Sequence, residues 1–108
     1  KAQADKLSFD GANNLKVTRV IASTPDHTTV TASTTSVLLK AANSARKAIY
    51  IVNNGSKTMW VKYVTPAVFG EGYPVLKDEM FIEDIYDGAI YAIWDTGATG
   101  NAQLTELT

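Results

Sequence analysis

The chain has 108 residues, no cysteine and a formal net charge of −1 at pH 7. This length fits a single domain, and the lack of cysteine excludes disulfides, thiolate metal sites and cysteine nucleophiles. The small net charge argues against a general nucleic-acid-binding protein. No apolar run approaches the roughly 20 residues that a membrane-spanning helix needs. We therefore expect neither a nucleic-acid partner nor a membrane partner.

Charge is divided unevenly along the chain. Residues 1–62 carry nine Lys and Arg against three acids, a balance of +6, whereas residues 63–108 carry one Lys against eight acids, a balance of −7. Two interpretations stay open. The two halves neutralise each other within one molecule, or oppositely charged faces of neighbouring copies attract each other.

Residues 1–14 are predicted to form an extended N-terminal arm. Leu7 and Phe9 are the only large apolar side chains in this segment, which ends in the turn-forming run Asp-Gly-Ala-Asn-Asn at 10–14. Such a segment is ordered only where its few apolar side chains find a pocket. We expect residues 15–108 to form a β-sandwich domain.

Short segments with alternating apolar residues or many β-branched residues predict strands in this domain. In chain order these segments are 15–21, 28–32, 36–39, the two arms of a hairpin within 49–61, 79–85, 89–95 and 102–107. Residues 23–27 are predicted to interrupt the strands, and the prolines and glycines of 66–74 to form a long connection.

The strongest local pattern is a hairpin centred on Asn54-Gly55, a dipeptide typical of the tight turn between two antiparallel strands. This turn would pair Val52 with Lys57 and Tyr50 with Met59. Both faces of the hairpin are largely apolar, so we expect it in the middle of a sheet that is covered on both sides, or covered on one side by a partner.

The fold class predicted from these elements is all-β. No stretch shows helical periodicity over three turns, and about eight short antiparallel strands at close spacing are typical of a single β-sandwich or a jelly-roll-like barrel.

No residue pattern indicates catalysis, and we predict no enzyme activity, cofactor or metal. His27, the only histidine, lies in the predicted break and is interpreted as a solvated loop residue. Five acids within 78–87 are interpreted as solvated charges that keep the edge of an apolar strand from pairing with another strand. Calcium binding and paired-carboxylate catalysis are the alternatives. Most of the aromatic side chains are interpreted as core residues, and a sugar-stacking platform, with Trp60, Tyr73 or Trp94 as its rings, is the alternative.

Four segments together resemble a module of small virion proteins of tailed bacteriophages. They are the run VLLKAANSARKAIYIVNNGS at 37–56, GYPVL at 72–76, GAIYAI at 88–93 and FDGANNLKV at 9–17. The resemblance covers residues 9–107 in discontinuous pieces. It implies a β-sandwich with a non-enzymatic role in the virion, as a head decoration or cement protein, a head fibre or a tail-associated adaptor, and assembly in trimers or around symmetry axes.

We therefore expect a capsid decoration protein that binds the outer shell, with the major capsid protein or other virion proteins as partners. A homo-oligomer is expected, with a trimer favoured, located in the virion after assembly in the bacterial host cytoplasm. A fibre-associated adaptor or glycan-binding module is the alternative. The residues predicted at the partner interface are Lys1, Lys6, Leu7, Phe9, Arg19, Trp60 and Tyr73.

Overall fold

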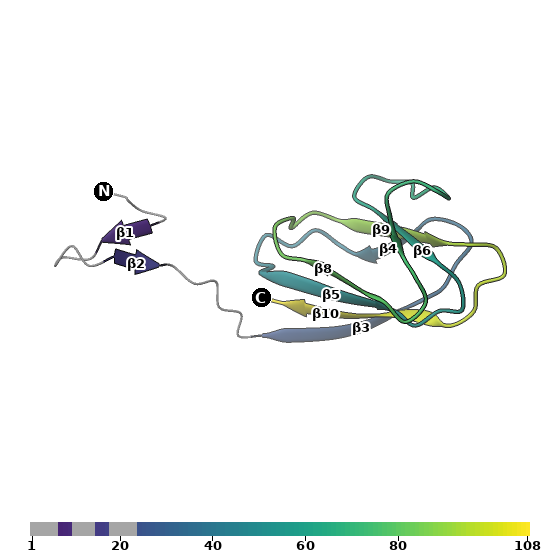
Figure 1. Cartoon of the computed structure of the whole chain (residues 1–108), viewed down its shortest axis with the longest axis horizontal. Coiled ribbons are helices and arrows are strands. Elements are labelled where there is room, and N and C mark those ends of the chain that lie inside the picture. Colours follow the sequence, from purple (N-terminus) through teal and green to yellow (C-terminus); the bar gives the residue numbers. More distant parts are fainter. Residues whose placement is uncertain (1–6, 10–14, 18–23) are drawn as a thin grey trace.

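The computed structural model describes residues 7–9, 15–17 and 24–108, and the regular elements among them are strands (Figure 1). Their bounds are β1 Leu7–Phe9, β2 Leu15–Val17, β3 Pro25–Thr31, β4 Val37–Lys40, β5 Ala48–Asn53, β6 Met59–Lys62, β7 Tyr73–Val75, β8 Met80–Glu83, β9 Ile90–Trp94 and β10 Asn101–Leu107.

Strands β3 to β10 form two antiparallel four-stranded sheets, ordered β3-β10-β5-β8 and β4-β9-β6-β7, which lie face to face (Figure 1). Their pairing is nested: β3 pairs with β10, β4 with β9, β5 with β8 and β6 with β7. Nested pairs of this kind arise when one long hairpin is rolled into two sheets, which is the arrangement of a jelly roll. The predicted all-β sandwich of about eight antiparallel strands is confirmed.

The predicted hairpin at Asn54-Gly55 is wrong. Strand β5 pairs with β10 and β8, while β6 pairs with β9 and β7, so the chain passes from one sheet to the other between them. Core burial explains the difference. Ile49 and Ile51 of β5 and Met59 and Val61 of β6 are all at most 2 % exposed and share one core. The predicted pairing would have placed these two sets on opposite faces of a single sheet.

Asn53 holds the crossing between the sheets in place. Its side-chain amide donates to the carbonyl oxygens of Lys57 and Val75, both at 2.8 Å. Its Oδ1 accepts from the backbone N–H of Gly55 and from Nε1 of Trp94, both at 3.0 Å. A fully buried amide needs such a complete set of partners, and here the partners come from the opposite sheet, through β7 and β9, and from the turn itself.

Two further boundaries differ from the prediction. Strand β3 already begins at Pro25, so residues 25–27 belong to a strand and not to a break. Strand β7, at Tyr73–Val75, lies within the predicted connection. Proline suggested a break in both places, but it is tolerated at the first residue of a strand and on edge strands, and β3 and β7 both lie at sheet edges.

Strands β1 and β2 pair antiparallel with each other, Leu7 opposite Val17 and Phe9 opposite Leu15. Among the described strands, neither has another partner. The remainder of the predicted strand 15–21 lies outside the described residues, and the boundary between an arm at 1–14 and a domain at 15–108 stays a prediction.

Ion pairs within the sandwich join the basic and acidic halves of the sequence. Arg46 Nε lies 2.8 Å from a carboxylate oxygen of Glu106, and Lys62 Nζ lies 2.8 Å from one of Glu71. These contacts agree with the first interpretation of the uneven charge, neutralisation within one molecule.

Candidate interaction surface

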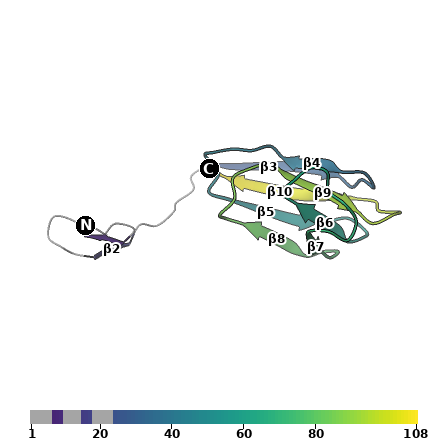
Figure 2. The ribbon, with the colours of Figure 1, turned by 90° about the horizontal axis from the view of Figure 1, so that it is seen from above.

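Large apolar side chains are exposed mainly along one side of the sandwich. Within residues 24–108, nine of the ten exposed examples belong to β5, β7, β8 or the connections that flank β7 and β8, and the tenth is Leu38 in β4. The nine are Tyr50, Val64, Val68, Phe69, Tyr73, Leu76, Met80, Ile82 and Ile85. Strands β7 and β8 are the edges of their sheets and lie on the same side of the sandwich (Figure 2). An apolar concentration of this kind on a soluble domain is typical of an interaction site.

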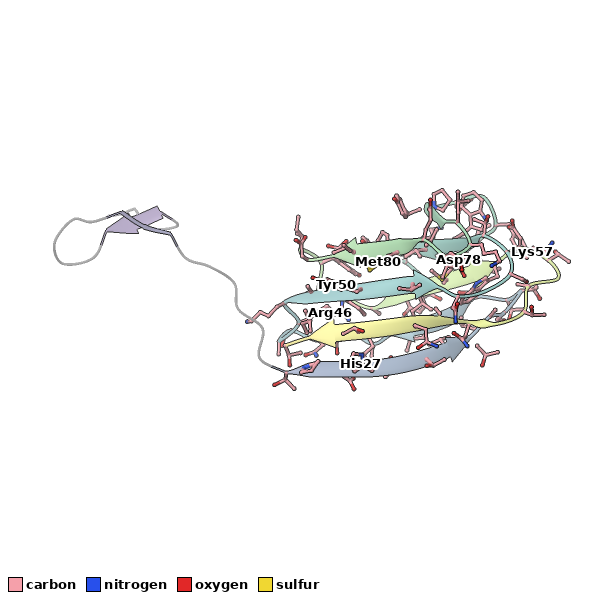
Figure 3. All side chains as sticks on the ribbon, turned by 60° about the horizontal axis from the view of Figure 1, so that its bottom comes forward. His27, Arg46, Tyr50, Lys57, Asp78 and Met80 are labelled. Atoms are coloured by element: carbon pink, nitrogen blue, oxygen red, sulfur yellow. The ribbon has the colours of Figure 1, made fainter. Side chains whose placement is uncertain are left out.

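The outer face of the β3-β10-β5-β8 sheet carries a four-residue apolar ladder, which we call the β8 ladder. Tyr50 is paired with Ile82, and Val52 with Met80, across β5 and β8. Figure 3 shows Tyr50 and Met80 on these neighbouring strands. Met80 and Ile82 are each 51 % exposed, so half of their surface is available for burial by a partner.

An aromatic pocket of about 270 Å³ opens between the two sheets. Tyr63, Tyr73 and Phe81 supply its rings, and the centroids of Tyr73 and Phe81 are 5.0 Å apart with the ring planes inclined by 45°. The remaining lining residues are Val61, Lys62 and Gly72. Phe81 also belongs to β8, so the pocket and the β8 ladder lie on opposite faces of the same edge strand.

Gly72 shapes one wall of this pocket through its backbone. Its φ is +89°, and a Cβ atom there would lie 2.2 Å from the carbonyl oxygen of Val61. Only glycine tolerates both the left-handed conformation and this approach. The neighbouring Glu71 carboxylate binds Lys62 Nζ at 2.8 Å, which ties the connection between β6 and β7 to β6.

A polar cluster beside the pocket holds the turn that follows β8. Glu83 accepts hydrogen bonds from the hydroxyl of Tyr63 and, at 2.8 Å, from the backbone N–H groups of Ile85 and Tyr86. Tyr63 stacks on Tyr86 with ring centroids 4.3 Å apart. The cluster fixes Ile85, whose side chain is 92 % exposed, at the end of the apolar side of the molecule.

The pKa values in this cluster shift in opposite directions. Burial raises the pKa of Tyr63, and the hydrogen bond to Glu83 and the charge of that carboxylate raise it further. Burial also acts to raise the pKa of Glu83. The bonds from Tyr63, Tyr86 and Ile85 and the nearby charge of Arg46 outweigh it, so the pKa of this carboxyl lies below its ordinary value. Glu83 is therefore held as a hydrogen-bonded anion.

Arg46 and Glu106 form a second, buried polar network. Beyond its bond to Glu106, the Arg46 guanidinium donates to the carbonyl oxygens of Gly88 and Ala41, at 2.9 and 2.8 Å. Asn43 donates to the other oxygen of Glu106 at 3.3 Å. The network joins the connection before β5, the connection before β9 and strand β10. Its polar groups hydrogen-bond to one another. This arrangement indicates a structural role.

The two predicted interface residues within the sandwich lie on neighbouring strands. Tyr73 is 54 % exposed and lines the pocket. Trp60 is half-buried, opposite Pro74 of β7, and its Nε1 donates to Asp95 at 2.8 Å. Trp94 is fully buried, so it is not available as the stacking residue that the sugar-platform alternative allowed.

The other predicted interface residues lie in the N-terminal segment. Leu7 and Phe9 are in β1. Lys1, Lys6 and Arg19 lie outside the described residues. The position of these five relative to a partner stays a prediction.

Sequence reasoning missed Tyr50, Met80 and Ile82 as exposed residues. The alternation in residues 79–85 places Met80 and Ile82 on one face of a strand and Phe81 on the other, but all three are apolar. The pattern therefore gave no signal for which face the core would cover.

The placement of His27 in a loop is also wrong. His27 lies in β3 opposite Thr105, with its Nδ1 2.9 Å from the threonine hydroxyl. In the part of the chain that the structure describes, no three His, Asp or Glu side chains gather as a metal site. Over the same residues, no helix has the length and apolar character needed to cross a bilayer.

Comparison of the chain with protein-family models, with curated proteins and with solved structures finds no match.

Proposed function

We propose that this chain is a non-enzymatic structural protein of a bacteriophage virion, which binds the outer surface of the capsid and holds neighbouring capsomers together. The observation that carries the proposal is the concentration of exposed apolar side chains on the β7 and β8 side of a small jelly roll. The resemblance of residues 9–107 to small virion proteins supplies the partner class, which is the major capsid protein or another virion protein. A homo-oligomer, with a trimer favoured, agrees with the same resemblance.

The proposed capsid contact is the connection between β6 and β7 together with the start of β7. Val68, Phe69 and Tyr73 are 38 %, 45 % and 54 % exposed there. Burying side chains of this size stabilises a contact by about 1.5–3 kcal/mol each before the cost of association is subtracted. Many identical copies on one shell would then bind with an avidity that a single contact lacks.

The direct test is to purify virions of the phage whose genome encodes the chain, identify the chain by mass spectrometry and locate it by cryo-electron microscopy. The expected result is density for a jelly roll on the outside of the capsid, with the β6–β7 connection against the shell. Absence of the chain from purified virions would overturn the proposal.

A matched pair of variants tests the contact face. Phe69→Asp should reduce binding of the full chain to capsids depleted of it. Leu38→Asp should leave binding unchanged, because Leu38 is similarly exposed, at 48 %, but lies in β4. Equal binding by both variants would exclude the β6–β7 connection as the contact.

The aromatic pocket favours a second candidate, a glycan-binding module of a fibre or adaptor. Aromatic rings beside polar groups are a common sugar-stacking arrangement, and Lys62 lines the same pocket as Tyr73 and Phe81. Binding to a glycan array that is lost on Tyr73→Ala and kept on Phe69→Asp would support this second function over capsid binding.

A further inference from the structure

Edge strands expose unpaired backbone groups, and proteins commonly protect them with proline or with a bulge. Three of the four edges in this sandwich have such protection. Strand β3 begins at Pro25, β7 has Pro74 at its centre, and β4 has an irregular register against β9 between Leu38 and Lys40. Strand β8 runs in unbroken register with β5 and contains no proline. Among the edges that the structure describes, β8 is therefore the one open to an added strand.

The backbone groups of Met80 and Ile82 point toward this open side. The N–H of Asn53 donates to the carbonyl of Glu79 at 2.9 Å, and the carbonyl of Asn53 accepts from the N–H of Asp78 at 2.8 Å. Asn53 and Glu79 therefore occupy a hydrogen-bonded position, with a bulge at Asp78 just before β8. Hydrogen-bonded and non-hydrogen-bonded pairs alternate along antiparallel strands. The pairs that Met80 and Ile82 make with β5 are therefore the non-hydrogen-bonded ones, and the N–H and C=O groups of both residues face away from β5.

Charge indicates which kind of strand the edge would accept. Residues 76–87 contain one Lys and five acids, a balance of −4. Asp78, Glu79 and Asp84, which flank β8, are all exposed. Antiparallel pairing of β8 with β8 of a second copy would bring these like charges together, which is unfavourable. A basic strand with alternating apolar residues fits the edge better.

The N-terminal segment of the chain has these properties. Residues 1–23 contain four Lys and Arg against two acids, a balance of +2, and β2 has the sequence Leu-Lys-Val. Strands β1 and β2 form a sheet of two three-residue strands that is joined to neither sheet of the sandwich. An isolated two-stranded hairpin is at best marginally stable in water, so addition to an open edge would stabilise it.

The length of chain after β2 favours an edge on another molecule. Strand β8 lies at the opposite edge of its sheet from β3. A strand added beyond β8 would lie four interstrand spacings, about 19 Å, from β3. Eight Cα–Cα steps separate Val17 from Pro25 and reach about 26–29 Å when fully extended, so a contact within one chain would use about two-thirds of that reach only to cross the sheet. A second copy has no such constraint.

We propose that strand β2 of one copy adds to strand β8 of a second copy, so that the β1–β2 hairpin extends the β3-β10-β5-β8 sheet of its neighbour. The contact rests on the proposed structural role and deepens it by naming the partner surface. It is head-to-tail, because donor and acceptor are different parts of the chain, and such contacts generate rings or open chains.

The test is sedimentation velocity of the full chain over a range of concentrations. We expect the wild type to form oligomers whose mass rises with concentration. Ile82→Pro should weaken association by about tenfold or more, because it removes an outward N–H from the acceptor edge. The double change Lys16→Glu with Arg19→Glu should do the same by reversing the charge balance of residues 1–23 from +2 to −2. A wild type that stays monomeric throughout would overturn the proposal.

The opposite edge of the same sheet provides the matched control. Thr24 and Thr108 exchange both backbone hydrogen bonds and so form a hydrogen-bonded pair. Because the two kinds of pair alternate along the strand, Thr29, an odd number of residues later, lies in a non-hydrogen-bonded pair, and its N–H points away from β10. Thr29→Pro therefore removes an equivalent outward N–H from β3, and it should associate as the wild type does. Ile82→Lys, which leaves the backbone unchanged and places a positive charge on the β8 ladder, covers the case in which Ile82→Pro fails to fold.

Mixing the two defective proteins distinguishes contacts between copies from contacts within one. The Ile82→Pro chain keeps its donor strand, and the Lys16→Glu with Arg19→Glu chain keeps its acceptor edge. Their equimolar mixture should form a one-to-one heterodimer and nothing larger. A mixture that stays monomeric would overturn the proposal. Self-association without capsid binding would support the β2–β8 contact and overturn the proposed function. Capsid binding by a chain that stays monomeric would support the proposed function and overturn the β2–β8 contact.

Discussion

The indole Nε1 of Trp94 in β9 donates a hydrogen bond of 3.0 Å to the side-chain oxygen of Asn53 in β5. Both residues are fully buried, and the bond joins the two sheets at the last residue of each of the two strands. A hydrogen bond at this position restricts the orientation of one sheet relative to the other. Apolar packing alone restricts it less, because apolar contacts have little directional preference. The location of β7 and β8 on the same side of the sandwich depends on that relative position of the sheets.

The amide of Asn53 is therefore expected to be among the most sensitive groups in the domain. Asn53→Ala leaves two carbonyl oxygens, one backbone N–H and the Trp94 indole N–H without their partner in the core. We expect the free energy of unfolding to fall by about 3–5 kcal/mol, measured by urea denaturation. Asn54→Ala, at the exposed neighbouring position, should change it by less than about 0.5 kcal/mol. Similar losses of unfolding free energy in the two variants would contradict this role of the Asn53 amide.

The buried ion pair of Arg46 with Glu106 should show strong coupling. Glu106→Gln leaves the guanidinium buried without its counter-charge, since the Arg46 side chain is only 1 % exposed. We expect a loss of about 3–5 kcal/mol in unfolding free energy, and Arg46→Met combined with Glu106→Gln should cost less than the sum of the two single changes. Lys77→Ala, at an exposed pair with Asp78, should cost about 0–1 kcal/mol. Additive losses at Arg46 and Glu106 would argue against coupling.

Two glycines in the connection before β7 provide a comparison between backbone strain alone and strain with a clash. Gly70 and Gly72 have φ values of +74° and +89°, but a Cβ atom at Gly70 meets nothing within 4 Å, whereas one at Gly72 meets the Val61 carbonyl oxygen. Gly70→Ala should cost about 1–2 kcal/mol for the left-handed conformation. Gly72→Ala should cost more, because β7 must also move away from β6. Equal thermal stabilities for the two variants would contradict the close approach.

The lowered pKa of Glu83 predicts a specific pH dependence. Because the folded-state pKa lies below the unfolded value, near 4.5, the carboxylate stabilises the fold above the unfolded pKa, and this contribution disappears as pH falls through the folded pKa. The difference in unfolding free energy between wild type and Glu83→Gln should therefore be constant near neutral pH and shrink below about pH 5. Tyr63→Phe should reduce the same dependence, since it removes one donor to Glu83. A difference that grows as the pH falls would contradict a folded-state pKa of Glu83 below the unfolded value.

Much of the local structure could be predicted from residue patterns because strand formation depends on short-range properties. Alternating apolar residues and β-branched side chains indicated the strands at 36–39, 89–95 and 102–107 within a few positions of β4, β9 and β10. The all-β class and the presence of about eight antiparallel strands follow from such patterns alone.

Which strands become neighbours was decided only by the tertiary structure. Backbone hydrogen bonds are nearly the same for every residue, so alternation shows which face of a strand is apolar and not which strand lies beside it. Asn54-Gly55 has the composition of a hairpin turn, yet burying Ile51 and Val61 in one core required the chain to change sheets there. The open edge at β8 has the same origin, because its exposure results from strand order, which depends on the packing of residues far apart in the sequence.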